Sequence, residues 1–347
     1  MNDINMNRKS FLYWKFFFIM LLSVSLSACT GKTGHAKHLA DSIRNRQIDS
    51  SVVAGIATHT EQTWSVIDSL EEVEAVSPQR ISYYRALTYY KKGDRQNTEK
   101  YLVKALDGNK LLVDNRELFY RSADLLASSM INRHEYKKAL AVATLGFEAS
   151  KADQSQAGRR WVALLLNAMG YCEMQLGHID AAERCFSQAY IALKQMVDVD
   201  PNYANLQDYA RLSCNTLDAY VSTRQYKKAA AWLESTEEAV NLLVASPECT
   251  KNVREKWEGG LYAKQALVLL HTGNRAGADA AFAKAMKLNY GQTGQGIIEF
   301  ATYLKEAGRT DELLHLLPQV DSVYTSWGDS KAANELHKFD TSAVPAN

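Results

Sequence analysis

Three arginines recur at an equivalent place in successive stretches of the chain, and their chemistry suits ligand recognition. Arg80, Arg121 and Arg211 each lie six residues before an apolar residue that would face a neighbouring helix. A guanidinium group presents a planar fork of donors that fits a carboxylate or a peptide backbone. Arginines at solvated helix starts would need no ligand, so both interpretations stay open at this point.

Other polar and aromatic side chains share this register. They lie three residues before these positions, or one residue after them, and in the third stretch the equivalent position is Gly170. If the register holds, they would line one surface together with the arginines. The candidate binding residues on this surface are Arg80, Tyr83, Arg121, Asp124, Asn167, Tyr171, Arg211 and Asp218.

Catalytic chemistry finds little support in the sequence. No phosphate-binding loop, dinucleotide-binding turn, zinc-protease motif or nucleophile elbow is present. The segment Gly291 to Gly296 has the glycines of a phosphate loop but no lysine follows it. His35 and His38 could share a helix face and bind a metal, although solvated side chains explain them better. We therefore expect no enzyme, no catalytic residue, no metal and no cofactor.

Four cysteines lie beyond residue 30, at positions 172, 185, 214 and 249. Cys172 and Cys185 fall on the two helices of one expected hairpin, where a disulfide is conceivable. Their neighbours are apolar, and a free cysteine behaves as a small core residue in such surroundings. The second interpretation is favoured.

Helices must position the candidate residues, and the stretch from Leu164 to Leu193 shows how. Apolar residues return every three or four positions on either side of Gly177-His178, which predicts two amphipathic helices joined by a tight turn. Gly170 and Ala182 are small where the two helices must approach, and Phe186 and Ala189 continue the same packing face.

This hairpin resembles the tetratricopeptide repeat (TPR), with Met169-Gly170, Ala182, Phe186 and Ala189 in the characteristic positions and Glu173 where a tyrosine is usual. Comparable hairpins recur around turns at residues 93, 134, 224, 273 and 308. The turns are about 41, 43, 47, 49 and 35 residues apart, against a period of about 34 for TPR. The resemblance implies an all-α, right-handed α-solenoid of about six stretched hairpins, whose first helices line a concave binding groove.

Residues 1–29 have the features of a secretory signal peptide. Positive charges at Arg8, Lys9 and Lys15 precede an apolar run of about 13 residues, shorter than the roughly 20 of a membrane-spanning helix. The end of the run, Leu26 to Cys29, is similar to the lipobox of bacterial lipoproteins. That resemblance implies cleavage before Cys29 and a lipid on its sulfur. An uncleaved membrane anchor is the alternative.

The rest of the chain divides by composition. We expect a flexible tether over 30–37, an N-terminal helical cap over 38–77, the repeat domain over 78–330, and a terminal helix with a disordered tail over 331–347. Basic and acidic residues are balanced at 40 and 39, so a nucleic-acid partner has no electrostatic support. Five prolines and few valine or isoleucine runs argue against a β-rich domain.

These features favour a membrane-anchored, non-enzymatic TPR lipoprotein of the bacterial cell envelope that binds a protein or peptide. We expect it to face the periplasm, because no acidic cluster follows Cys29, although surface exposure stays possible. The leader, the stretched hairpins and the segment Glu335 to Asp340 also look like the periplasmic sensor region of TPR-containing histidine kinases. That second resemblance implies a sensory adaptor or a ligand-sensing module without its kinase. A glycan-binding surface lipoprotein is a third possibility.

Overall fold

The computed structural model describes residues 34–326 except residue 59, and the chain divides after Val76 into two units. The first unit holds helices α2 (Gly34–Thr58) and α3 (Thr60–Glu72), which pack against each other. α2 begins at Gly34, within the segment expected to be a tether. The signal segment with Cys29 and the tail 331–347 lie outside the described residues.

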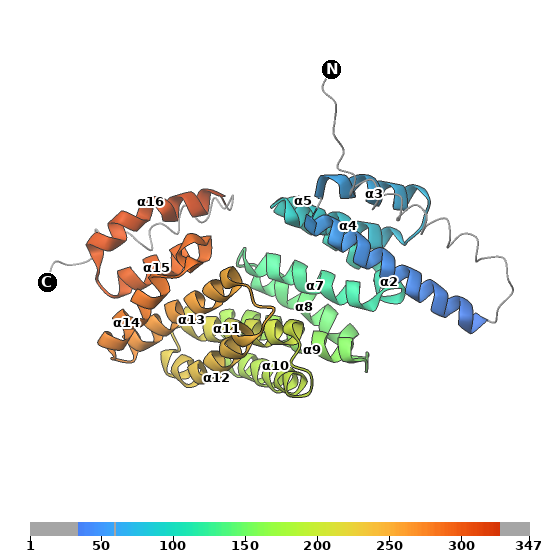
Figure 1. Cartoon of the computed structure of the whole chain (residues 1–347). Helices are drawn as coiled ribbons and strands as arrows, with labels where there is room; N and C mark the ends of the chain where they lie inside the picture. Colours follow the sequence, from blue (N-terminus) through green and yellow to red (C-terminus); the bar gives the residue numbers. More distant parts are fainter. Residues whose placement is uncertain (1–33, 59, 327–347) are drawn as a thin grey trace, which may run out of the picture. The chain divides into compact units, whose positions relative to one another are not determined.

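The described part of the second unit, residues 77–326, is a series of six helical hairpins, each with a first (A) helix and a second (B) helix. In Figure 1 the hairpins follow one another in sequence order, from the blue-green pair α4 and α5 to red α16. The A helices are α4 (Pro78–Lys91), α7 (Arg116–Ile131), α9 (Gln156–Gln175), α11 (Tyr203–Ser222), α13 (Lys251–His271) and α15 (Gly294–Glu306). The B helices are α5 (Arg95–Leu106), α8 (Tyr136–Lys151), α10 (Ile179–Val199), α12 (Tyr226–Ala245), α14 (Arg275–Met286) and α16 (Thr310–Ser326).

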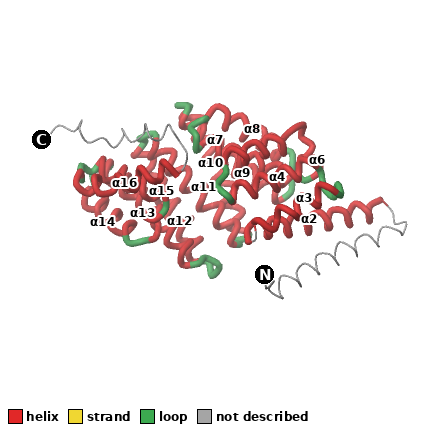
Figure 2. The backbone as a smooth tube through the Cα atoms, turned by 90° about the horizontal axis from the view of Figure 1, so that it is seen from above, coloured by secondary structure: helices red, strands yellow, loops and turns green. Residues whose placement is uncertain are grey.

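Short elements join some of these hairpins. They are η2 (Asp107–Asn109), α6 (Lys110–Asp114) and η3 (Asn289–Gln292). Figure 2 shows helices connected by short loops, and no strand occurs among the residues that the structure describes. The expected all-α solenoid of stretched TPR-like hairpins is therefore confirmed.

The six turns that join A to B helices lie at the predicted residues and have the same geometry. Gly93, Gly177, Gly273 and Gly308 have φ between 70° and 90°, and His134 and Arg224 adopt φ of 59° without being glycine. In each turn the next residue donates its N–H to a carbonyl five positions back, as His178 does to Glu173 at 2.9 Å. This is a left-handed C-terminal cap of the Schellman type, which satisfies carbonyls at the end of the A helix.

The beginnings of the A helices are also alike. Each A helix follows a serine, threonine or asparagine whose side chain accepts a hydrogen bond from the backbone N–H three residues later. Such a cap satisfies one of the donors that a helix start leaves without a partner. The N-cap residues are Ser77, Asn115, Ser155, Asn202, Thr250 and Thr293.

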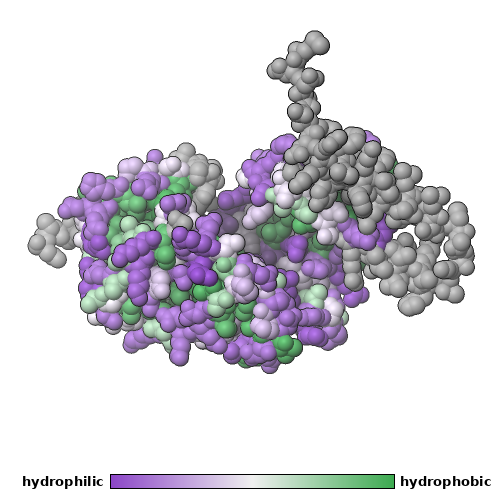
Figure 3. All heavy atoms as spheres, in the orientation of Figure 1, coloured by the Kyte–Doolittle hydropathy of each residue, from purple (hydrophilic) through white to green (hydrophobic). Residues whose placement is uncertain are grey.

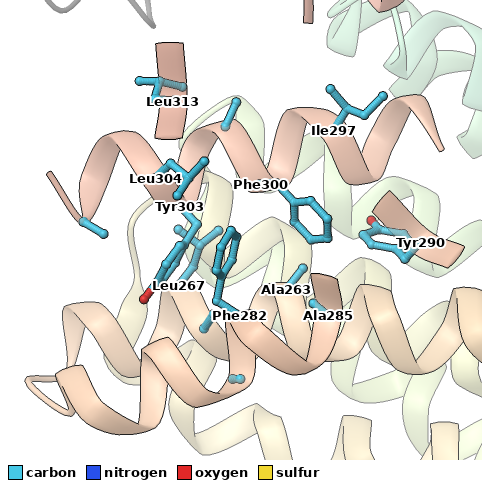
Figure 4. Close-up of a cluster of buried hydrophobic side chains, with 14 of the residues drawn as sticks. Ala263, Leu267, Phe282, Ala285, Tyr290, Ile297, Phe300, Tyr303, Leu304 and Leu313 are labelled. Atoms are coloured by element: carbon cyan, nitrogen blue, oxygen red, sulfur yellow. The ribbon is translucent and has the colours of Figure 1, made fainter. Parts of the chain in front are cut away.

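The interior of each hairpin depends on small residues, as the third hairpin shows. A Cβ atom added at Gly170 would lie 2.7 Å from the Phe186 ring, so the ring occupies the space that a side chain would need. Phe186 and Ala182 are fully or almost fully buried. Figure 4 shows the same principle between α13, α14 and α15, where Phe282 stacks on Tyr303 at 4.4 Å between ring centroids.

Long helices account for most of the stretched spacing between hairpins. The five helices from α9 to α13 are 20 or 21 residues long, whereas α5 and α14 have 12 residues each. No helix within 34–326 combines the length and apolar character that crossing a membrane requires. The cysteines 172, 185, 214 and 249 are free, as their interpretation as core residues predicted.

Candidate functional site

The A helices of the second unit are joined to one another through polar side chains, and this surface is the candidate site. We call it the A-helix face. On the central helix α11 it follows one stripe, because Asp208, Arg211, Asn215 and Asp218 are spaced three or four residues apart. Each of these side chains interacts with another A helix.

The first part of the face is an arginine cluster formed by Arg121, Asp124, Arg160, Asp208 and Arg211. Arg211 bridges two carboxylates, with distances of 3.3 Å to Asp208 and 3.6 Å to Asp124 of α7. Arg160 of α9 donates from Nε to Asp208. The cluster therefore links α7, α9 and α11 through charge-assisted hydrogen bonds and ion pairs.

The carboxylates of this cluster lie deeper than its arginines. Asp124 and Asp208 are buried, whereas the Arg211 side chain is 41% exposed. Burial raises the pKa of Asp124, and the Arg211 guanidinium opposes that shift. Arg121 stays partly exposed and interacts with the Tyr83 hydroxyl and with Glu117. Guanidinium groups thus form the water-facing layer of the cluster.

Amide side chains continue the face along α9 and α11. Asn215 donates to Asn167 Oδ1 at 2.9 Å, and Asn167 reaches Leu212 O and Thr216 Oγ1 at 3.4 Å. Asn167 is buried, so its amide holds the two A helices together rather than facing solvent. Gln175 donates to Ser222 Oγ, and these are the last residues of α9 and α11.

The second part of the face surrounds Lys264, and we call it the Lys264 recess: Tyr171, Asp218, Lys264, Tyr290 and Glu299. Lys264 Nζ lies 3.3 Å from Asp218 Oδ1 and 3.0 Å from Glu299 Oε1, which joins α11, α13 and α15. Lys264 and Glu299 are buried, but the Asp218 side chain keeps 35% of its surface exposed. Burial raises the pKa of Tyr171 of α9, and the nearby Asp218 carboxylate raises it further.

The pKa values in the recess follow from its two carboxylates and one ammonium group. Burial raises the pKa of Asp218 to about 6; Lys264 opposes this shift and Glu299 adds to it. Burial lowers the pKa of Lys264, but the two carboxylates outweigh it and raise that pKa well above its ordinary value. Lys264 is therefore a fixed cation between two carboxylates, of which Asp218 is the one that water reaches.

The structure brings most of the predicted residues together on this face. Arg121, Asp124 and Arg211 meet in the arginine cluster, Asn167 lies between the two parts, and Tyr171 and Asp218 meet at the recess. Tyr83 is buried and interacts with Arg121 of the face.

Arg80 does not belong with the other two predicted arginines. It is 1% exposed and donates to Asp114 Oδ1 of α6 at 2.9 Å. Ser77 also donates to Asp114, so this group ties the start of α4 to the segment between hairpins. The equivalence of three arginines fails here because α6 covers the first A helix at that position.

Several residues of the face were not predicted, among them Arg160, Asp208, Asn215, Lys264, Tyr290 and Glu299. Arg160 and Asp208 lie near the starts of α9 and α11, in the part by which these helices exceed a standard repeat. Lys264 and Glu299 both lie two residues before the small position of their hairpins, Ala266 and Ala301. The predicted register included only residues six or three before that position and one after it. Their shared offset was a usable signal, whereas Tyr290 comes from the irregular segment before α15. No group of residues suited to a metal occurs in the described part of the chain.

Comparison with known proteins identifies the fold. No protein-family model matches the chain, and no curated protein matches it. Among solved structures it is similar to the apo form of RapI, with a TM-score of 0.55 and 15% identity over 83% of this chain and 97% of that chain. This likeness supports a TPR-like helical repeat fold.

Proposed function

We propose that the protein is a non-enzymatic recognition module that binds a protein or peptide segment along its A-helix face. The observation that carries this proposal is the row of partly exposed, charged side chains that crosses the three successive A helices α7, α9 and α11. Packing alone does not require such residues, since apolar side chains could fill the same positions at no cost in hydrogen bonding. Arg121, Arg160 and Arg211 offer donors to backbone carbonyls or carboxylates of an extended ligand.

The N-terminal sequence supports a cellular setting for this module. We infer that residues 1–29 direct export and that Cys29 carries a lipid, so that the module acts as a scaffold or sensory adaptor anchored at the cell envelope and facing the periplasm. Figure 3 shows hydrophilic and hydrophobic residues interspersed over the coloured face of the second unit, which is consistent with a surface exposed to water. Metabolic labelling with a radioactive fatty acid tests the lipid: incorporation into wild type and none into Cys29→Ala is the expected result.

The binding function is tested by cross-linking in an envelope extract. The full-length chain is compared with the double variant Arg160→Gln, Arg211→Gln and with Arg184→Gln, which changes an exposed arginine on the B helix α10. We expect a cross-linked partner with wild type and with Arg184→Gln, and its loss with the double variant. A partner that survives the double change would show that binding does not use the arginine cluster.

A further inference from the structure

The Lys264 recess carries more negative charge than its own cation balances. Asp218 and Glu299 face the single ammonium group of Lys264, and no other cation among the described residues contributes to the pKa of Asp218. Both buried members are held firmly: Glu299 Oε1 also accepts from Gln295 Nε2 at 3.0 Å. The surplus charge therefore resides mainly on Asp218, at the water-facing end of the group.

A second observation concerns the buried carboxylate. Glu299 Oε2 is enclosed and accepts no hydrogen bond of regular geometry, although the Tyr290 hydroxyl interacts with this carboxylate. Buried carboxylate oxygens usually have a donor, because leaving one without a donor costs desolvation energy. Because this oxygen is enclosed, an added cation would compensate the surplus charge through Asp218 and would not bind Glu299 directly.

The aromatic side chain that accompanies Asp218 is suited to a long cationic side chain. Asp218 of α11 interacts electrostatically with Tyr171 of the preceding A helix α9, and the Tyr171 ring is 6.4 Å from the Tyr136 ring of α8. Aromatic rings beside a carboxylate receive the methylene stem of an alkylammonium or guanidinium group, and the carboxylate receives its charged end. Asp218 is exposed enough to make that contact, unlike Lys264 and Glu299.

We propose that the Lys264 recess is a subsite for the side chain of a lysine or arginine in the bound peptide, with Asp218 as its direct partner. This inference rests on the proposed function and specifies the ligand of the same face. The arginine cluster lies about 10 Å away along α11, because Arg211 and Asp218 are seven residues apart at about 1.5 Å per residue. An extended peptide of a few residues spans that distance, so a basic side chain at the recess and a carbonyl or acidic group at the arginines can bind together.

The test uses mixtures of seven-residue peptides, acetylated and amidated at their ends, with uncharged residues at every position except the centre. The central residue is lysine in one mixture and norleucine in a second, and a third mixture has central norleucine with a free N-terminal amine. Retention on the immobilised full-length chain at pH 7.5 is measured by mass spectrometry. The variants are Asp218→Asn and, as the matched control, Asp198→Asn, which changes an exposed aspartate on the B helix α10.

We expect about tenfold stronger retention of the lysine mixture than of the norleucine mixture by wild type and by Asp198→Asn, equivalent to about 1.4 kcal/mol. Asp218→Asn should reduce the lysine mixture to the norleucine level while its thermal unfolding shows an intact fold. Equal retention of both mixtures, or a preference for the free terminal amine, overturns the subsite. If retention is equal but falls with Arg160→Gln, Arg211→Gln, the proposed function stands without the subsite. If no mixture is retained, both fail.

Discussion

The interior of each hairpin and the A-helix face solve the same packing problem with opposite chemistry. Between A and B helices, small residues let apolar side chains fill all the space, as Phe186 does over Gly170. Between successive A helices, buried carboxylates, amides and a lysine form hydrogen bonds and ion pairs instead. Apolar contacts stabilise the fold without requiring a particular partner atom. The polar contacts also place charged groups where a ligand of complementary charge can bind.

The largest effect is expected in the hairpin interior. Phe186→Ala removes a ring that is 1% exposed and packs against Tyr220 at 6.1 Å between centroids. Deleting a buried phenylalanine side chain costs about 3–5 kcal/mol, because it combines lost burial with a cavity. Chemical denaturation monitored by circular dichroism measures the loss. The control on the same helix is Ile191→Ala, an exposed residue whose loss should change stability by less than about 0.5 kcal/mol. Similar losses for both would contradict this description of the interior.

A slightly smaller loss is expected from Lys264→Met on the A-helix face. The change preserves length but leaves Asp218 and Glu299 without a cation, and removing one partner of a buried ion pair costs about 3 kcal/mol. Losing the Lys264 charge would raise the pKa of Asp218 further and let it protonate, so the variant should regain stability as the pH falls from 7 to 5. Denaturation at the two pH values measures this recovery. Lys194→Met on α10, where the ion pairs are exposed, should be nearly neutral. A Lys264→Met variant as stable as wild type would show that the recess is not a buried ionic site.

A third prediction concerns Asp218 and the pH dependence that it gives to the free energy of unfolding. Because the folded-state pKa of Asp218 is raised to about 6, the folded state binds its proton more tightly than the unfolded state does. Its contribution is therefore present at about pH 4 and is lost as the pH rises through 6. Asp218→Asn should remove this slope and be at least as stable as wild type at pH 7. The size will be modest, since a third of the side chain faces water and screening weakens the effect. Stability curves of both proteins between pH 4 and pH 7 provide the measurement, and parallel curves would contradict it.

The same contrast explains what the sequence could and could not predict. Turns, small residues and apolar spacing are local signals, so residues 93, 134, 177, 224, 273 and 308 and the Gly170–Phe186 contact could be assigned from the chain alone. The contacts of the A-helix face join residues about 35 to 90 positions apart, as in Lys264 with Glu299 and Asp124 with Arg211. Such pairs depend on the lengths of α9, α11 and α13, which a standard repeat does not give. Arg80 was misplaced for a related reason, because the covering helix α6 lies in an irregular connection.

The smallest expected effect lies at the turns, where two of six hairpins use a residue other than glycine. His134 and Arg224 have φ of 59°, a left-handed conformation that costs an L-residue with a side chain about 1 kcal/mol. Arg224→Gly should therefore stabilise the protein by up to about 1 kcal/mol, whereas Gly177→Ala, at φ of 85°, should destabilise it by a similar amount.

His134 is a less suitable position for this test, since its Nδ1 lies 2.6 Å from the Tyr136 hydroxyl and its replacement also removes that contact. No atom comes within 4 Å of a Cβ built at Gly177, so the loss there would reflect backbone conformation alone. Opposite signs for the two changes in denaturation experiments would show that the turns contribute through backbone geometry, independently of both the hairpin interior and the A-helix face.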